Sequence, residues 1–327
     1  MKLVRKAVST LMLTCGAWIA AAPSPAHALC PGSTVRFLVP FPASGSSADS
    51  LSRAVAASLS EIWSKNVIVE NKPGAGGIAA TQTIATSPPD GCTIGLVSAA
   101  IAANPGLMKN KLPYDTLQDL TMISQLVDIP VGLFAPPSLP ANNVKELIEY
   151  AKQQPQGLTY GTPGVGTGSH MAGALLASMT GANLIHVPYR GLAPAELDML
   201  AGRISMMFGA VSSEVGAIKA GKVKLIALTG DRRFPAFPDV PTIGATLPGY
   251  SVGSYFGVVG PGSMAKPLAA RISQDIAKAM NANEVKARLN VLQLVGVGST
   301  PEEFEKLVRS DITALNKLIA AAGITIE

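Results

Sequence analysis

Three segments combine flexible backbone with small hydroxyl side chains at points where a helix is expected to begin. They span residues 41 to 49, 71 to 77 and 161 to 170, and each follows a short apolar run. The first N–H groups of a helix have no partner inside the helix, and the positive end of the helix dipole lies beside them. Helix starts of this kind attract carboxylates and phosphates, so the sequence indicates a protein that holds an acidic ligand.

The loop from 41 to 49 supplies the first set of candidate contacts. Its backbone N–H groups and serine hydroxyls can surround a carboxylate or a phosphate. An ordinary loop between a strand and a helix, with a serine cap and Asp49 as a first-turn acid, is the alternative interpretation. The candidates are Phe41, Ala43, Ser44, Gly45, Ser46, Ser47 and Asp49.

The loop from 161 to 170 has four glycines within its first eight residues. Glycine allows the backbone to approach a ligand closely, at an entropic cost that a purely structural loop rarely needs repeatedly. This favours ligand binding, whereas His170, in the expected first helical turn, is interpreted as a local hydrogen-bonding residue. The candidates are Thr162, Gly164, Gly166, Thr167, Gly168 and Ser169.

Signatures of catalysis and of cofactor binding are weak. Residues 74–79 match Gly-x-Gly-x-x-Gly/Ala, but they follow the second predicted strand at a distance of several residues, so a structural turn fits better than a dinucleotide site. The sequence has no nucleophile elbow, no P-loop, no His-Glu-x-x-His and no standard metal-ligand spacing. We therefore expect no cofactor, no metal and no catalysis. A secreted α/β hydrolase using Ser169 or Ser46 with His170 is the enzymatic alternative.

The first 28 residues have the pattern of an export signal. A basic start precedes an apolar stretch and the small-x-small sequence Ala26-His27-Ala28. We predict cleavage after Ala28 and a periplasmic location. Removal of three basic residues lowers the basic count from 26 to 23 against 21 acidic residues, a net charge of +2. With no basic patch visible, the sequence does not indicate a nucleic-acid partner.

Apolar runs alternate with helical periodicity, which is typical of mostly parallel sheets flanked by helices. The predicted strands are 35–39, 67–69, 93–97, 131–135, 158–160, 185–187, 204–208, 224–228 and 255–259. The chain after the signal is long enough for two domains. We predict lobe 1 at 29–128 plus 252–327 and lobe 2 at 129–251, with the ligand in the cleft that the C-terminal strand ends face.

Cys30 and Cys92 are the cysteines that remain after the signal is removed, and each comes just before a predicted strand. If those strands are parallel neighbours, both sulfurs lie at one sheet edge. A disulfide and two separate buried thiols are both consistent with the sequence.

The chain resembles the Bug family, the periplasmic solute receptors of tripartite tricarboxylate transporters. The matching segments include 39–43, 69–77, 89–91, 112–115, 186–191 and 238–242. The resemblance implies two α/β lobes of the periplasmic-binding-protein type that close around a small carboxylate. It implies contacts from loop 41–49, from Ser98 and Ala99 after the third strand, and from Thr162 to Ser169. It also implies the membrane permease subunits of such a transporter as partners.

Three features depart from the family pattern. The first loop is one residue longer, with Ser44 in place of a glycine, while Cys92 and Tyr255 stand where the family often has Tyr and Trp. We expect a monomeric receptor that captures a small organic carboxylate by hinge closure. A sensory co-receptor for a membrane histidine kinase is the alternative, because it would use the same cleft.

Overall fold

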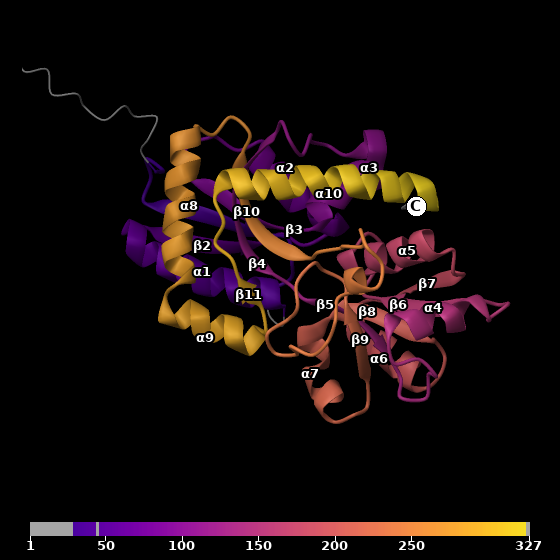
Figure 1. Ribbon diagram of the computed structural model, residues 1–327. Helices are drawn as coiled ribbons and strands as arrows, with labels where there is room; N and C mark the ends of the chain where they lie inside the picture. The colour runs from indigo at the N-terminus through magenta and orange to yellow at the C-terminus, as the bar shows by residue number, and fades with distance from the viewer. Residues whose placement is uncertain (1–28, 44–45, 325–327) are drawn as a thin grey trace, which may run out of the picture.

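The computed structural model describes residues 29–43 and 46–324, arranged around two β-sheets (Figure 1). The predicted export signal and two candidate residues, Ser44 and Gly45, lie outside the described residues. Among the residues that are described, no helix combines the length and the apolar character needed to cross a membrane.

The first sheet has six strands in the order β11-β4-β10-β3-β1-β2. Its strands are β1 (Thr34–Val39), β2 (Asn66–Asn71), β3 (Thr93–Ser98), β4 (Leu120–Asp128), β10 (Tyr255–Pro261) and β11 (Val295–Gly296). Strands β1, β2 and β3 pair in parallel, while β10 lies antiparallel between β3 and β4. Both faces of β3 and β10 are buried, which accounts for their nearly continuous apolar sequences.

Helices cover both faces of this sheet. One face packs against α1 (Ser47–Trp63), α8 (Lys266–Met280) and α9 (Asn283–Leu292). The other packs against α2 (Ile78–Ala85), α3 (Ala100–Met108) and the first half of α10 (Pro301–Ala322). In α1, Leu51, Val55 and Leu59 recur every four residues and are fully buried, so one helical stripe faces the sheet.

The second sheet has five strands in the order β7-β6-β8-β5-β9. They are β5 (Val131–Ala135), β6 (Leu158–Thr162), β7 (Leu184–Pro188), β8 (Met206–Ala210) and β9 (Lys224–Leu228). Strands β6, β7 and β8 are parallel, and β5 is antiparallel to β8 and β9. One face packs on α4 (Val144–Lys152) and α5 (Gly168–Thr180), the other on α6 (Leu192–Leu200) and α7 (Val211–Lys219). Short 3₁₀ turns occur at Ala75–Gly77, Lys109–Lys111 and Ile243–Ala245.

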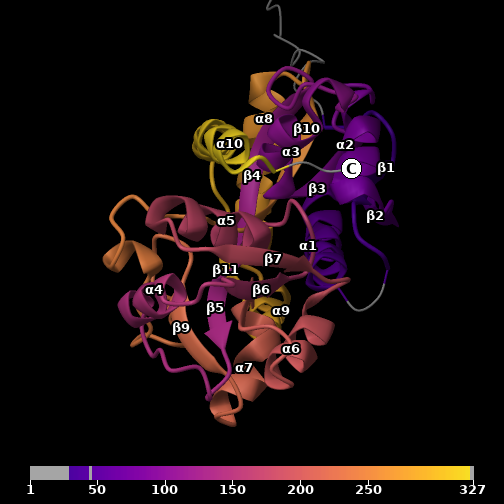
Figure 2. The same cartoon turned by 90° about the vertical axis from the view of Figure 1, so that its right-hand side faces the viewer.

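The chain passes between the sheets twice. Strand β4 leads through Ile129 and Pro130 directly into β5, and residues 229–254 lead from β9 back into β10. Helix α10 connects them again, because Phe304 packs in the core of the first sheet and Leu318 in that of the second. Figures 1 and 2 both show its C-terminal half beside α5. The lobe boundaries at 128 and 252 stay a prediction.

The predicted α/β class, with two sheets flanked by helices, is confirmed, and all nine predicted strands occur. The sheets are mixed rather than mostly parallel, because β10 is antiparallel to β3 and β4, β11 to β4, and β5 to β8 and β9. Strands β4 and β11 and helices α3 and α9 were not predicted. The centre of β4 carries Ser124 and Gln125, which interrupt the apolar pattern. Both are buried and hydrogen-bonded to Ser299, more than 170 residues away, so tertiary contacts satisfy their polar groups.

Candidate functional site

The predicted ligand loops follow the C-terminal ends of strands in both sheets. Strand β1 leads through residues 40–46 into α1, and β3 leads through Ala99 into α3. In the second sheet, β6 leads through residues 163–167 into α5. Leu38 of β1 lies opposite Gly95 of β3. The turns that follow these two parallel strands therefore begin at the same end of the sheet. Each helix start presents unpaired N–H groups beyond its strand.

The turn after β3 and the loop after β6 meet around one small cavity. Its volume of about 30 Å³ is enough for one or two ordered water molecules. Gly168 lies close to the second chain crossing, because a Cβ atom at this glycine would be 3.2 Å from the carbonyl oxygen of Gly253. The lining residues are Ala99, Ala103, Gly166, Gly168, Met171, Ser251, Val252, Gly253, Asp311, Ala314 and Leu315. The N-termini of α3 and α5, from different sheets, therefore converge at this cavity.

The described part of the first loop lies apart from that cavity. Ser46, Ser47 and Asp49 line an open hollow of about 450 Å³ against α9, beside Arg288. The ring of Phe41 packs edge-on against Phe256 at 5.6 Å, and Phe256 pairs with Ser98 in the sheet. Of the first-loop residues that the structure describes, none lines the cavity of Ala99 and Gly166. A pocket shared by the two loops stays a prediction.

Asp49 belongs to a polar network that fixes the first loop. The side-chain amide of Asn71 donates to the carbonyl oxygen of Phe41 at 2.9 Å and to Asp49 Oδ1 at 2.8 Å. Arg53 donates to Asp49 Oδ2 and to Asn71 Oδ1, each at 3.0 Å. These residues connect the ends of β1 and β2 to α1. The network gives Asp49 a structural role, and its contact with a ligand stays a prediction.

The candidate hydroxyls hold the helix starts in place. Thr167 Oγ1 accepts from the backbone N–H of His170 at 3.2 Å and donates to the carbonyl of Gly164 at 2.8 Å. Ser46 Oγ likewise accepts from the N–H of Asp49 at 3.1 Å. Both are N-caps, which orient the remaining free N–H groups rather than offering unused donors.

Two histidines stack directly behind the second loop. The rings of His170 and His186 lie 3.9 Å apart and nearly parallel. The N–H of Gly166 donates to His170 Nδ1 at 3.2 Å, and His186 Nε2 lies 2.7 Å from Thr162 Oγ1. The pKa of each imidazole is lowered to about 4, by burial in both rings and, to a smaller extent, by the neighbouring His186 in the case of His170. Both rings are neutral near pH 7. The predicted local hydrogen-bonding role of His170 is confirmed, whereas the stacking with His186 was not predicted.

Neither serine of the hydrolase alternative is paired with this histidine. Ser169 is buried at 5% exposure, and Ser46 is occupied as a helix cap. In the described part of the chain, no hydrogen bond joins the side chain of either serine to His170. The imidazole Nδ1 already accepts a backbone N–H, so the arrangement lacks the contact between nucleophile and base that such chemistry requires.

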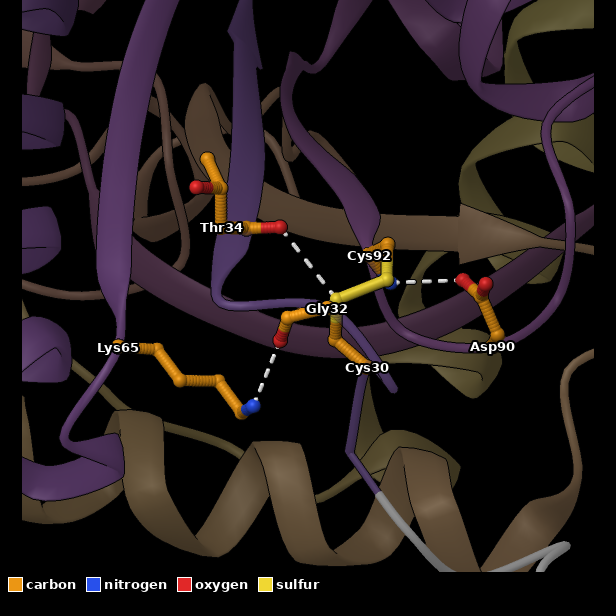
Figure 3. The surroundings of a disulfide bond; sticks show 6 residues. All are labelled: Cys30, Gly32, Thr34, Lys65, Asp90 and Cys92. Atoms are coloured by element: carbon orange, nitrogen blue, oxygen red, sulfur yellow. Dashed lines mark hydrogen bonds between the residues drawn. A yellow bond between two sulfur atoms is a disulfide. The ribbon is translucent and has the colours of Figure 1, made fainter.

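The two cysteines are joined by a disulfide (Figure 3). It lies at the N-terminal ends of strands in the first sheet, away from the C-terminal ends that lead into the predicted ligand loops. The cysteines come just before the parallel neighbours β1 and β3, with their Cα atoms 4.5 Å apart. Asp90 supports both: its carbonyl accepts the N–H of Cys30 and its carboxylate the N–H of Cys92, each at 2.8 Å. The structure thus decides between the two alternatives that the sequence left open. The bond lies at the N-terminal ends of these strands, whereas the predicted ligand loops follow the C-terminal ends. We therefore assign the disulfide a structural role.

Sequence reasoning missed Asp311 of α10. It is the one ionisable residue among the described residues that line the cavity, and its pKa is raised to about 6 by burial. The nearby hydroxyl of Tyr255 lowers that pKa slightly. No local pattern singles out Asp311, because it lies in an amphipathic helix rich in charged residues. Ala314 and Leu315 follow Asp311 by three and four residues, so the three share one face of the helix. An acid on this apolar face was the one sign in the sequence that Asp311 is buried.

Comparisons with known proteins identify the family. The model of the tripartite tricarboxylate transporter family receptor matches residues 51–324. The solved periplasmic binding protein BugD is 31% identical, with a TM-score of 0.73, and the match covers 91% of this chain and 100% of that one. A Rhodopseudomonas palustris protein solved with adipate is 30% identical, with a TM-score of 0.76 over 90% and 99% of the two chains.

A third similar structure is MatC from the same organism, solved with bound malate. It is 27% identical, with a TM-score of 0.72, and the match covers 89% of this chain and all of that one. The family match, the two sheets and the helix starts that converge between them agree. The chain therefore belongs to the receptor family of the tripartite tricarboxylate transporters, the family that contains the Bug proteins.

Proposed function

We propose that this chain is a periplasmic receptor that captures a small organic carboxylate and delivers it to the permease subunits of a tripartite tricarboxylate-type transporter. The observation that carries the proposal is the convergence of the α3 and α5 N-termini at one cavity between the sheets. Unpaired N–H groups and two helix dipoles attract an anion there, and no side chain among the described lining residues is cationic.

The ligand class follows from the chemistry of this cavity and from the relatives. The described lining residues include no lysine or arginine, so we propose that a carboxylate is held by backbone donors and ordered water. Adipate and malate, the ligands of two similar structures, are both short dicarboxylates. We propose a short dicarboxylate for this chain, bound without chemical turnover.

Capture would occur by closure about the two chain crossings at 129–130 and 229–254. The cavity is smaller than a dicarboxylate, so the lobes, proposed at 29–128 plus 252–327 and 129–251, must separate to admit one. We propose that the complete first loop, with Ser44 and Gly45, contributes further backbone donors when the ligand is enclosed. The closed state is then stabilised because the ligand contacts both lobes.

Direct binding measurements test the proposal. Protein starting at Leu29 would be purified without refolding and its released ligand identified by mass spectrometry, followed by calorimetric titration with adipate and malate. Gly168→Ala places a methyl group 3.2 Å from the carbonyl of Gly253 and should weaken binding several-fold. Gly216→Ala is the control, because a Cβ atom there meets open space.

Two results would contradict the function. Equal affinity of the Gly168→Ala variant and the wild type would place the ligand elsewhere. Conversion of a bound carboxylate to a different product during incubation would favour an enzyme over a receptor.

A further inference from the structure

Asp311 occupies an unusual position for an acid. It lies near the middle of α10, where the helix passes from the core of the first sheet to that of the second. Its side chain borders the cavity together with Ala99 and Gly168, which belong to the starts of α3 and α5. A carboxylate ligand drawn to these helix starts would therefore lie beside another carboxyl group. Two ionised carboxylates in one small cavity repel each other unless one of them is protonated.

The surroundings of Asp311 favour its protonated form. Burial is the larger effect on the pKa of Asp311 and raises it to about 6, while the Tyr255 hydroxyl from β10 interacts with the carboxyl and lowers that pKa. That hydroxyl is itself buried, and burial together with the Asp311 carboxyl raises its pKa, yet no well-formed hydrogen bond joins it to any described residue. No described cation pairs with Asp311. The polar groups at this point are thus incompletely satisfied, which is typical of a site completed by a ligand or by water.

Other ionisable groups on the neighbouring elements do not counteract the rise in the pKa of Asp311. Helix α3 and residues 251–254 carry none, α5 carries only His170, which is neutral near pH 7, and β4 carries only Asp128, whose pKa is raised by burial. Helix α8 carries Lys266, Arg271, Asp275 and Lys278, but it meets α10 at its first turns, around Pro301 and Glu302. Lys109, Tyr114 and Asp115 lie with Ile312 around a separate hollow, and none of them lines the cavity that Asp311 borders.

We infer that Asp311 contacts the bound carboxylate as a protonated acid, donating its O–H to a ligand oxygen, so that ligand capture takes up one proton. The inference rests on the proposed function and adds a specificity-determining residue to it. The proton comes from water, and no covalent bond changes. Without ligand Asp311 is largely ionised at pH 7.5, and the ligand's negative charge raises the pKa of the carboxyl further, which makes binding and protonation mutually reinforcing.

Calorimetry measures the proton directly. Wild-type protein would be titrated with adipate and with malate between about pH 5.5 and about pH 8.5, in pairs of buffers that differ in ionisation heat. We expect close to one proton taken up per ligand above about pH 7. The affinity should fall by up to about tenfold per pH unit above about pH 6, the limit for one linked proton. These readouts need no variant.

Two variants assign the proton to Asp311. Asp311→Asn keeps a donor in the same place but cannot titrate, so it should bind with no proton uptake and with an affinity that is independent of pH. Glu214→Gln is the matched control, because Glu214 is also buried and has a pKa raised to about 7, but it lies on α7. This variant should keep the proton uptake of the wild type.

The outcomes separate this inference from the proposed function. Binding without proton uptake, or pH dependence that persists in Asp311→Asn, overturns the inference alone. An affinity that rises with pH also overturns it, because it would mean that ionised Asp311 attracts a cationic group. Absence of binding to both dicarboxylates contradicts the proposed dicarboxylate function and the inference with it.

Discussion

The stacked pair of His170 and His186 should remain uncharged well into the acid range. An exposed imidazole has a pKa near 6.5, whereas burial holds both of these near 4. Lowering one such pKa from about 6.5 to about 4 corresponds to at most roughly 3 kcal/mol of unfolding free energy, and because the stacked rings titrate as a pair, the two contributions do not simply add. Between about pH 6.5 and about pH 4 the unfolded chain binds protons that the folded chain does not. The contribution of the pair is therefore complete above about pH 6.5 and is lost as the pH falls toward 4.

Global stability alone would hide this effect. Glu214 and Asp311 have raised pKa values of about 7 and about 6, so their contributions change with pH in the opposite direction over an overlapping range. The imidazoles must be observed directly. In protein starting at Leu29, His170 and His186 are the only histidines, so proton–carbon NMR spectra of the rings contain two sets of signals. A His186→Asn variant assigns them.

We expect both signals to titrate with midpoints near pH 4 in the folded protein and near pH 6.5 in urea. The two steps belong to the pair, because protonation of one ring disfavours protonation of its stacked neighbour. Protonation of His170 also removes the acceptor for the Gly166 N–H, so dicarboxylate binding should weaken as the rings titrate. A folded protein in which either ring titrates near pH 6.5 would refute the burial argument.

Three further predictions test separate parts of the structure. Reduction of the Cys30–Cys92 disulfide should lower the unfolding free energy by about 4 kcal/mol, from loop closure over a separation of 62 residues, as measured by urea denaturation. Two reactive thiols in the denatured, unreduced protein would exclude the bond. Thr167→Ala and Ser46→Ala should each cost about 1 kcal/mol of stability through loss of a helix cap, and each should weaken ligand binding by about 0.5 to 1.5 kcal/mol. Thr167→Ser, which keeps the cap, should retain most of both, and unchanged calorimetric affinity in both alanine variants would place the site elsewhere. Glu214→Gln should raise stability by up to roughly 3 kcal/mol at pH 8 and change it little at pH 4, because the buried carboxyl is protonated at low pH and ionised at high pH. Equal effects at the two pH values would show that Glu214 has an ordinary pKa.

Local sequence patterns predicted much of the secondary structure because apolar periodicity is a short-range property. Strands β5 and β9 occur at the predicted residues. Strand β4 was not predicted because its buried Ser124 interrupts the apolar run. The hydroxyl of Ser124 is hydrogen-bonded to Ser299, a partner that only the tertiary structure provides. Strand β10, the antiparallel neighbour of β4, likewise could not be placed between β3 and β4 from periodicity, which carries no information on strand order.

For the candidate site too, residue types predicted one part and the tertiary structure was needed for the other. The loop chemistry at 41–49 and 161–169 could be proposed from the residue types, because glycine and hydroxyl side chains at a helix start are typical of anion sites as well as of helix caps. Which of these residues are helix caps, and which face a common cavity, depended on distances across the fold. Ala99 and Gly166 border one cavity, while Ser46 borders another.

The amino-acid sequence by itself determined the two-sheet α/β class and the family, and it indicated the loops for which we predict ligand contacts. Tertiary structure alone decided the disulfide, the stacked histidines and the place of Asp311 in the cavity wall. Each of these brings together residues from separate elements. Such contacts arise from the packing of whole elements, and burial then sets the charge state of the groups that meet. Local spacing along the chain encodes neither these contacts nor the charge states that follow from them.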